Sequence, residues 1–354
     1  MASKIFLWGI FFSASSVILS IRDIWNHIPC NEEYHPPNCD FRELNLVTLD
    51  DYDRCGPAML PLNARNYFLG AAGRRITYMK NKNEFDKIEV VPRMLRDVSK
   101  NTLETSTLGI QLDFPIGLSP VALHKLADPR GELATVEGIS PFRTIMILSS
   151  MATTLIEDVG QAAQHTNITL WMQTYIFDNR TWTLELVRRA ERAGFKGVVV
   201  TADAPVDGTI TCDGRQSIGE SDGELIVNLD ITQHKLSPSA TFKDIAWLRS
   251  FTKLPIIVKG ILSGDDATRA IMAGASAILV SNHGGRQMDG DPATINALPG
   301  VVDAVNRMFP RRDVFLDGGI RRGTDVYKAL ARGRRWFSWE DPSSGDSLLM
   351  GQLV

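Results

Sequence analysis

The feature that most constrains the fold is a regular alternation of short apolar runs and helical stretches between Phe114 and Gly333. Parallel strands buried on both faces have continuous apolar runs, and the helices between them supply the crossovers. Strands are predicted at 115–122, 144–150, 169–177, 197–203, 255–261, 277–283 and 313–319, and helices include 181–193, 264–273 and 323–331. Seven strand–helix units, with an eighth strand expected after Gly333, favour a (β/α)8 TIM barrel over a doubly wound sheet.

The polar residues at the strand ends decide between these two folds. They are Ser149, Gln173, Tyr175, Thr201, Asp203, Lys259, Ser281, His283 and Asp317. A barrel gathers catalytic groups from many strands at its carboxyl-terminal end, whereas a doubly wound sheet concentrates them at one switch point. The wide distribution of these residues therefore favours the barrel.

Composition narrows the range of partners. The 354 residues include 38 basic and 41 acidic side chains, a net charge of −3, and this balance predicts no nucleic-acid partner. The four cysteines are too few and too scattered for a disulfide scaffold or a zinc site. No cluster of metal ligands is found, so no metal is predicted.

The segment SNHGGRQ (281–287) is the sharpest chemical signal. It places a base, His283, at a strand end beside a fixed cation, Arg286. The two glycines allow the backbone to approach a ligand closely, and an arginine can clamp a carboxylate through two parallel hydrogen bonds. The alternative is a structural histidine next to a loop arginine, which the reactive groups on the other strand ends disfavour.

Two further signals are cationic. The segment DGGIRRG (317–323) joins a strand to a helix through glycines, a pattern that predicts an anion site at a helix N-terminus. A simple tight turn is the alternative. Lys259 ends the apolar run PIIVKG and is expected to face the barrel interior or a ligand, where it would stabilise developing negative charge. A buried lysine without a chemical role is the alternative reading.

Together, these segments resemble the FMN-dependent 2-hydroxy-acid oxidases, which include glycolate oxidase. Three further segments share the resemblance: QTY at 173–175, TADAP at 201–205 and VVPRMLRDVS at 90–99. The resemblance extends from about Val47 to Gly333. It implies a (β/α)8 barrel with FMN that oxidises an (S)-2-hydroxy acid to a 2-oxo acid and reduces oxygen to hydrogen peroxide. It also implies a homo-oligomer, commonly a tetramer, and a peroxisomal location. A catalytically impaired relative that acts only as a binding module is the alternative.

The resemblance also implies roles for particular residues. His283 would take the substrate proton while a hydride passes to the flavin, and Asp203 would orient it. Arg286 would bind the substrate carboxylate with Tyr67 and Tyr175, and Lys259 would stabilise the reduced flavin. The expected flavin contacts are Pro120, Val121, Ala122, Ser149, Gln173, Thr201, Lys259 and Ser281 for the ring and ribityl chain, and Asp317, Gly318, Gly319 and Arg321 for the ribityl and phosphate end.

The chain departs from the family pattern at four places before its C-terminal region, one of which is a shorter loop before Trp247. Ile210 stands where a second carboxylate-binding arginine is usual, with Arg215 as a possible substitute. Met151 replaces a bulky aromatic residue, which predicts room for longer substrates. The segment ARNYFLGA is one residue short before Gly70, so the position of Tyr67 is open.

The ends of the chain are expected to differ from the barrel at residues 47–333. Residues 1–46 are interpreted as an apolar leader and linker, because residues 5–21 carry no charge. This run is a signal peptide, a membrane anchor or a foreign leader. The sequons at Asn167 and Asn179 argue against the secretory route, because a glycan at Asn179 would lie on the catalytic side of the barrel.

The tail at 334–354 is a poor strand, which predicts that the eighth strand and the C-terminal helices are missing or frame-shifted. Residues 335–346, read two nucleotides further on, can encode Val-Val-Phe-Val-Gly-Arg-Pro-Val-Leu-Trp-Gly. A frame slip near Arg332–Arg335 is therefore our hypothesis for this tail.

Overall fold

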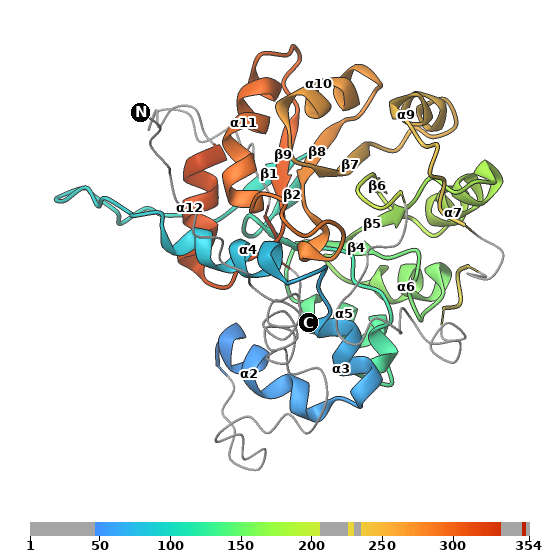
Figure 1. The fold of residues 1–354 in the computed structure, drawn as a ribbon, viewed down its shortest axis with the longest axis horizontal. Coiled ribbons are helices and arrows are strands. Elements are labelled where there is room, and N and C mark those ends of the chain that lie inside the picture. The colour runs from blue at the N-terminus through green and yellow to red at the C-terminus, as the bar shows by residue number, and fades with distance from the viewer. Residues whose placement is uncertain (1–46, 206–225, 230–234, 334–348, 352–354) are drawn as a thin grey trace, which may run out of the picture.

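A closed barrel of parallel strands forms the centre of the molecule, with helices around its outside (Figure 1). The computed structural model describes residues 47–205, 226–229, 235–333 and 349–351. The order around the barrel is β10-β3-β4-β5-β6-β7-β8-β9. The strands are β3 (Ile116–Leu118), β4 (Ile145–Leu148), β5 (Thr169–Thr174), β6 (Gly197–Thr201), β7 (Ile256–Ile261), β8 (Ala277–Val280), β9 (Asp313–Leu316) and β10 (Leu349–Gly351). The predicted TIM barrel is confirmed.

Each of the seven predicted strands is present, but most end before the predicted boundary. The prediction 277–283, for example, contains β8, which ends at Val280. The ladder ends there because Ser281 and the following residues leave the sheet to form a loop. Most of the polar residues that the sequence placed at strand ends therefore lie at the last residue of a strand or just beyond it, whereas Gln173 and Lys259 lie within the last three residues of β5 and β7.

The expectation of a missing eighth strand is corrected by β10. Leu349–Gly351 pairs in parallel with β3 at three residues and with β9 through Leu349 and Leu316. The three residues of β10 match the full length of β3, which also has three residues, and one of them pairs with β9 as well. The segment in which the shifted reading frame would place this strand, 335–346, lies outside the described residues.

Within the described residues, a helix follows each of the seven strands from β3 to β9. They are α5 (Glu132–Ile139), α6 (Ile156–Ala163), α7 (Arg180–Arg192), α9 (Phe242–Arg249), α10 (Gly264–Met272), α11 (Thr294–Asn306) and α12 (Gly323–Gly333). Side-chain caps fix several starts: Asn179 accepts from Thr181 N at α7, and Ser263 accepts from Asp266 N at α10. The predicted helices 181–193, 264–273 and 323–331 agree with α7, α10 and α12 within two residues.

The barrel interior is filled with apolar side chains and closed at its amino-terminal end. Trp171 and Phe315 lie 5.5 Å apart between ring centroids inside this core. A hairpin of β1 (Thr105–Thr107) and β2 (Ile110–Leu112) covers that end, where Leu112 joins the interior cluster. Thr107 Oγ1 donates to Asp313 Oδ2 at the start of β9. A ligand site is therefore left to the carboxyl-terminal end.

Three N-terminal helices lie beside the barrel: α2 (Leu49–Met59), α3 (Leu62–Leu69) and α4 (Ile76–Asp86) (Figure 1). Two short 3-10 turns, η1 (His124–Leu126) and η2 (His283–Gly285), follow β3 and β8. Packing of α4 against η2 and α11 brings this N-terminal helix to the loops that carry the predicted catalytic residues.

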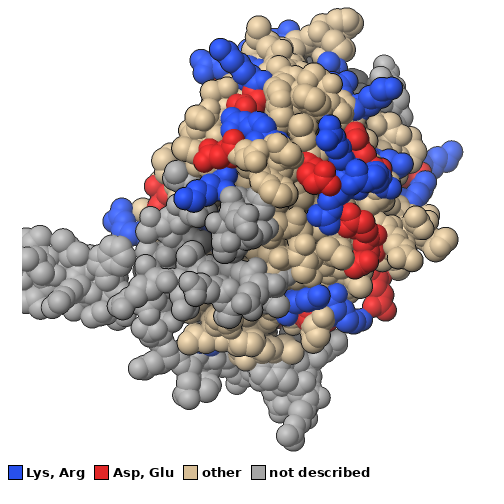
Figure 2. Space-filling model, turned by 90° about the vertical axis from the view of Figure 1, so that its right-hand side faces the viewer, with Lys and Arg blue, Asp and Glu red and all other residues tan. Residues whose placement is uncertain are grey.

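The surface carries both charges. On the face in Figure 2, basic and acidic side chains are interspersed. None of the helices within the described residues combines the length and the apolarity needed to cross a membrane. The uncharged run 5–21 lies outside this part of the chain. A search of the described residues finds no group of three or more His, Cys, Asp or Glu side chains suited to hold a metal.

Candidate active site

The loop after β8 holds His283 in an unusual backbone conformation. His283 has φ +58°, and Gly284 and Gly285 follow with φ +66° and +77°. A Cβ on Gly285 would lie 2.6 Å from the backbone nitrogen of Tyr78, so only glycine allows α4 to approach here. The two glycines of SNHGGRQ thus serve helix packing and a left-handed turn that presents His283.

His283 and Asp203 form the central pair of the site. His283 Nδ1 lies 2.8 Å from Asp203 Oδ1. Burial on its own would raise the pKa of Asp203, but the charges of Lys259 and His283 outweigh it and lower the pKa from 3.8 to about 2. An ionised carboxylate only accepts hydrogen bonds, so Nδ1 carries the ring hydrogen and Nε2 keeps the lone pair of a base.

Lys259 lies between two acidic residues at the end of β7. Its side chain is 3% exposed, and Nζ lies 3.8 Å from Asp203 Oδ2 and 4.0 Å from Asp317 Oδ2. Asp317 also accepts a hydrogen bond from Ser119 Oγ at 2.8 Å. A buried charge needs such partners, and these two carboxylates supply them inside the barrel mouth.

Arg286 and Tyr67 meet across the same hollow. Arg286 Nη1 donates to the backbone oxygens of Tyr67 and Gly70, both at 2.8 Å, and its guanidinium lies 5.0 Å from the centre of the Tyr67 ring. Burial raises the pKa of the Tyr67 hydroxyl above its usual 10. The hydroxyl is therefore a neutral donor at physiological pH, and the one-residue shortening before Gly70 leaves Tyr67 beside Arg286.

These residues line one hollow at the carboxyl-terminal end of the barrel. Its walls contain nearly all the predicted catalytic and ring-binding side chains and two others, Phe68 and Met151. The lining comprises Tyr67, Phe68, Pro120, Val121, Ala122, Ser149, Met151, Gln173, Tyr175, Thr201, Lys259, His283 and Arg286. Asp203 and Ser281 are the exceptions. Asp203 lies behind His283 and is bonded to its Nδ1, and the fully buried Oγ of Ser281 accepts from His283 N at 3.1 Å.

Gln173 has a defined orientation in the floor of this hollow. Its Oε1 accepts from Ser150 N at 3.0 Å, and its Nε2 donates to Thr201 Oγ1 at 3.0 Å. All three side chains are buried. The amide is therefore fixed by the protein before any ligand binds.

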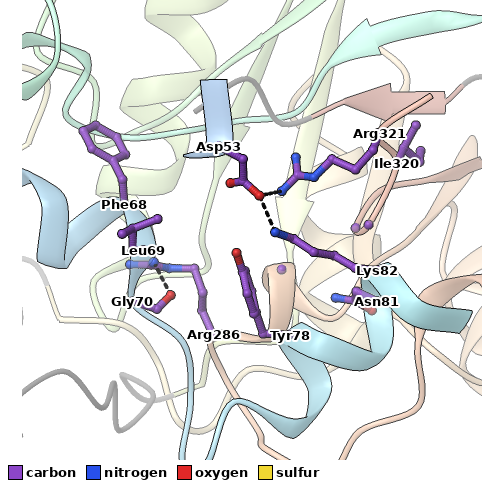
Figure 3. Close-up of a pocket in the computed structure, with 13 residues that line it drawn as sticks. Asp53, Phe68, Leu69, Gly70, Tyr78, Asn81, Lys82, Arg286, Ile320 and Arg321 are labelled. Carbon is purple, nitrogen blue, oxygen red and sulfur yellow. Dashed lines mark hydrogen bonds and ion pairs between the residues drawn. The ribbon is translucent and has the colours of Figure 1, made fainter. Parts of the chain in front are cut away.

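A second hollow adjoins the first and is lined by the predicted anion loop (Figure 3). Phe68 and Arg286 line both hollows. Gly318 and Gly319 have φ +91° and +85°. The N–H groups of Arg321 and Arg322 donate to Asp325 Oδ2, which caps α12. The expected anion site therefore depends on the Arg321 side chain and the glycines rather than on those two N–H groups.

Helix α4 joins the two loops. Asn81 and Asn282 exchange two side-chain hydrogen bonds of 2.8 Å each. A Cβ on Gly319 would overlap the backbone oxygen of Asn81, so the anion loop is packed directly on the helix. Sequence reasoning missed these contacts and the lining residues Asp53, Tyr78 and Lys82, since no local motif links positions about 200 residues apart.

Of the departures from the family pattern at Met151 and Ile210, the structure describes the first and not the second. Met151 is among the residues that line the first hollow. Ile210 and Arg215 lie outside the described residues.

The two hollows therefore place a base and an arginine beside a cationic loop at one end of the barrel. The sequence profile of the FMN-dependent dehydrogenases matches residues 57–337. The chain is 41% identical over 302 residues to a 2-hydroxyacid oxidase of Dictyostelium discoideum, covering 82% of this chain and 76% of the relative. It is likewise 41% identical to a peroxisomal (S)-2-hydroxyacid oxidase of Arabidopsis thaliana, covering 81% and 82%. The chain belongs to the FMN-dependent dehydrogenase family and is an oxidoreductase.

Solved structures agree with this assignment. A mandelate oxidase variant with (S)-mandelic acid superposes with a TM-score of 0.75 at 32% identity, over 86% of this chain and 84% of that one. A flavocytochrome b2 variant with sulfite bound gives a TM-score of 0.74 at 31% identity, over 87% and 75%. The predicted family is thus confirmed from both sequence and fold.

The site fits the cofactor of this family, FMN. Asp317 Oδ1 and Arg321 Nε are buried without a hydrogen-bond partner within the described residues. Buried polar atoms are nearly always partnered, so these two suit a ligand with hydroxyl and phosphate groups. Residues of the first hollow, Val121 and Lys259 among them, would hold the ring, and Arg321 in the second would hold the phosphate end.

Proposed function

We propose that this protein oxidises an (S)-2-hydroxy acid to the 2-oxo acid and passes the electrons to oxygen, forming hydrogen peroxide. The observation that carries the proposal is the placing of His283, oriented by Asp203, in the same hollow as Arg286. A base and a carboxylate-binding cation on one hollow match a substrate that carries a hydroxyl group next to a carboxylate.

The substrate carboxylate binds to Arg286. Two of its donors are used on backbone oxygens, which fixes the plane of the guanidinium and leaves its other N–H groups for a bidentate contact. Tyr67 donates its neutral hydroxyl to the same carboxylate, and Tyr175 lines the wall beside it. These contacts place the substrate hydroxyl within reach of His283.

His283 takes the proton of the substrate hydroxyl on Nε2. Asp203 stabilises the imidazolium that results, because its low pKa keeps it ionised throughout. Lys259 stabilises negative charge that develops at the floor of the hollow. When bound, FMN would accept the hydride of the substrate and pass its two electrons on to oxygen.

Relatives that are named for different substrates suggest a panel for the test. They include L-lactate oxidase of Nostoc and glycolate oxidase of Spinacia oleracea. We would measure the flavin spectrum and peroxide release with glycolate, L-lactate, mandelate and 2-hydroxyoctanoate. Because Met151 stands in the wall where the family usually has a bulky aromatic residue, we expect one of the larger acids to be turned over best. Bound FMN without reduction by any 2-hydroxy acid would contradict the proposal and favour a binding module.

His283→Ala is the decisive variant. Loss of a general base lowers the rate of flavin reduction by about 10²–10⁴-fold, while FMN binding stays intact. A matched control is His165→Ala, a histidine at the surface after α6. An alanine variant that reduces its flavin at the original rate would remove His283 from this role.

We also propose a peroxisomal location and a homotetrameric assembly. A peroxisomal relative at 41% identity supports the first, and family resemblance supports the second. Asn179 supports a non-secretory route, since its side chain caps α7 and a glycan there would compete with this hydrogen bond. Fluorescent tagging and sedimentation of the native protein test both statements.

A further inference from the structure

The second hollow contains a cation that the sequence did not indicate. Lys82 of α4 extends toward Arg321 of the anion loop, and both contact one acidic residue of α2 (Figure 3). Lys82 Nζ lies 2.5 Å from Asp53 Oδ2, and Arg321 Nη2 lies 3.6 Å from the same oxygen. Two cations from different parts of the chain therefore converge on a single carboxylate oxygen.

Lys82 is held in place before any ligand binds. Its Nζ lies 4.8 Å from the centre of the Tyr78 ring, one turn back on α4. The helix itself is fixed to the catalytic loop by Asn81 and to the anion loop at Gly319. Only a quarter of the Lys82 side chain is exposed. A cation with so little freedom is suited to bind an anion with a small loss of entropy.

Asp53 occupies the place that a bound anion would take. A carboxylate carries one negative charge, whereas a phosphate monoester carries about 1.5 to 2 at neutral pH. Asp53 therefore leaves the paired charges of Lys82 and Arg321 incompletely neutralised, and a phosphate would neutralise them better. Because α2 is also linked by Asp50 to Arg322 at 2.6 Å, the helix can stay attached when Asp53 gives up its contacts.

We propose that Lys82 and Arg321 together bind the phosphate of FMN, and that Asp53 occupies this two-cation site until the phosphate displaces it. The proposal rests on FMN as the cofactor of the proposed function. It adds a cofactor-binding residue, Lys82, and a competing residue, Asp53, on two helices outside the strand-end motifs. Both lie among the residues that line the second hollow.

The test compares flavins with and without the phosphate. We would titrate the full-length apoprotein with FMN and with riboflavin and follow quenching of flavin fluorescence. Lys82→Gln should weaken FMN binding about tenfold and leave riboflavin binding unchanged. Asp53→Asn should strengthen FMN binding severalfold, because it removes the competing charge, again without effect on riboflavin. Lys80→Gln is the control, since two residues along a helix point about 200° apart.

Each outcome of these titrations supports or overturns a role proposed for Lys82 or Asp53. Unchanged preference for FMN over riboflavin in Lys82→Gln would overturn the role of Lys82, and weaker FMN binding in Asp53→Asn would make Asp53 a structural support instead. If Lys82→Gln does not fold, Lys82→Arg, which keeps the charge, should bind FMN normally. Inorganic phosphate should raise the Tm of the apoprotein and have less effect on the Lys82 variant. Failure of the unaltered protein to bind either flavin would instead contradict the cofactor assignment.

Discussion

His283 Nδ1 and Asp203 Oδ1 lie 2.8 Å apart, although 80 residues separate them in the chain. Asp203 follows β6 and His283 follows β8, so the barrel closure brings them together across β7. Gly260 makes this possible, because a Cβ there would lie 2.6 Å from the Cβ of Asp203. The pair is thus a product of barrel geometry and of one glycine in the strand between them.

Asp203→Asn should lower the rate of flavin reduction by about 10²–10⁴-fold, because the neutral amide cannot stabilise a protonated His283. FMN affinity should change little. Stopped-flow reduction under anaerobic conditions measures the rate, and Asp265→Asn on α10 serves as the control. A rate close to that of the unaltered protein would show that Asp203 does not assist His283.

The same carboxylate should make stability depend on acid pH. The pKa of Asp203 is lowered from 3.8 to about 2, so its contribution is complete above pH 4 and is lost as the pH falls through 2. This contribution is about 2 kcal/mol in the free energy of unfolding. Urea titrations between pH 5 and pH 2 should show a shallower decline for Asp203→Asn. Parallel declines in the two proteins would rule out this contribution.

Arg286→Lys should raise the KM for the hydroxy acid at least tenfold, because an ammonium cannot bond to Tyr67 O and Gly70 O while it forms a bidentate contact with a carboxylate. Tyr67→Phe removes only a hydroxyl and should raise KM by a smaller factor. Steady-state peroxide release gives both values. Equal KM values in all three proteins would place the carboxylate elsewhere.

Gly319→Ala should destabilise the protein and weaken FMN binding, because its Cβ would overlap the backbone oxygen of Asn81 and φ is +85°. The loss is expected to reach several kcal/mol in the free energy of unfolding. Gly323→Ala, at the first residue of α12, meets nothing within 4 Å and should be neutral or slightly stabilising. Thermal unfolding of the two variants distinguishes crowding at Asn81 from a general intolerance of substitution.

The sequence was sufficient to predict the barrel and most of the first hollow. Strand periodicity located β3 to β9, and the reactive residues at the strand ends predicted Lys259, Gln173 and His283 because such ends converge in a barrel. Strand boundaries were less accurate, since an apolar run does not show where the ladder of hydrogen bonds stops. The short strand β10 escaped prediction because Leu349–Gly351 has too few residues for a periodic pattern.

The second hollow could not be predicted in the same way. Asp53 and Lys82 are charged residues on ordinary helices, and nothing in the local sequence separates them from solvated surface residues. Their place in the second hollow results from the packing of α2 and α4 against a loop that lies more than 230 residues later in the chain. Ser119 is similar, because its bond to Asp317 joins the ends of β3 and β9, which lie on either side of β10, and no local motif indicates this contact.

The position of α4 has a consequence for biosynthesis. The helix leaves the ribosome early, but the loops at Asn282 and Gly319 that it joins are made some 200 residues later. Contacts of such large sequence separation form late, after much of the chain is ordered. A nascent chain should therefore be unable to bind flavin until β9 and α12 have been synthesised. Flavin binding would then indicate that this last part of the barrel has folded.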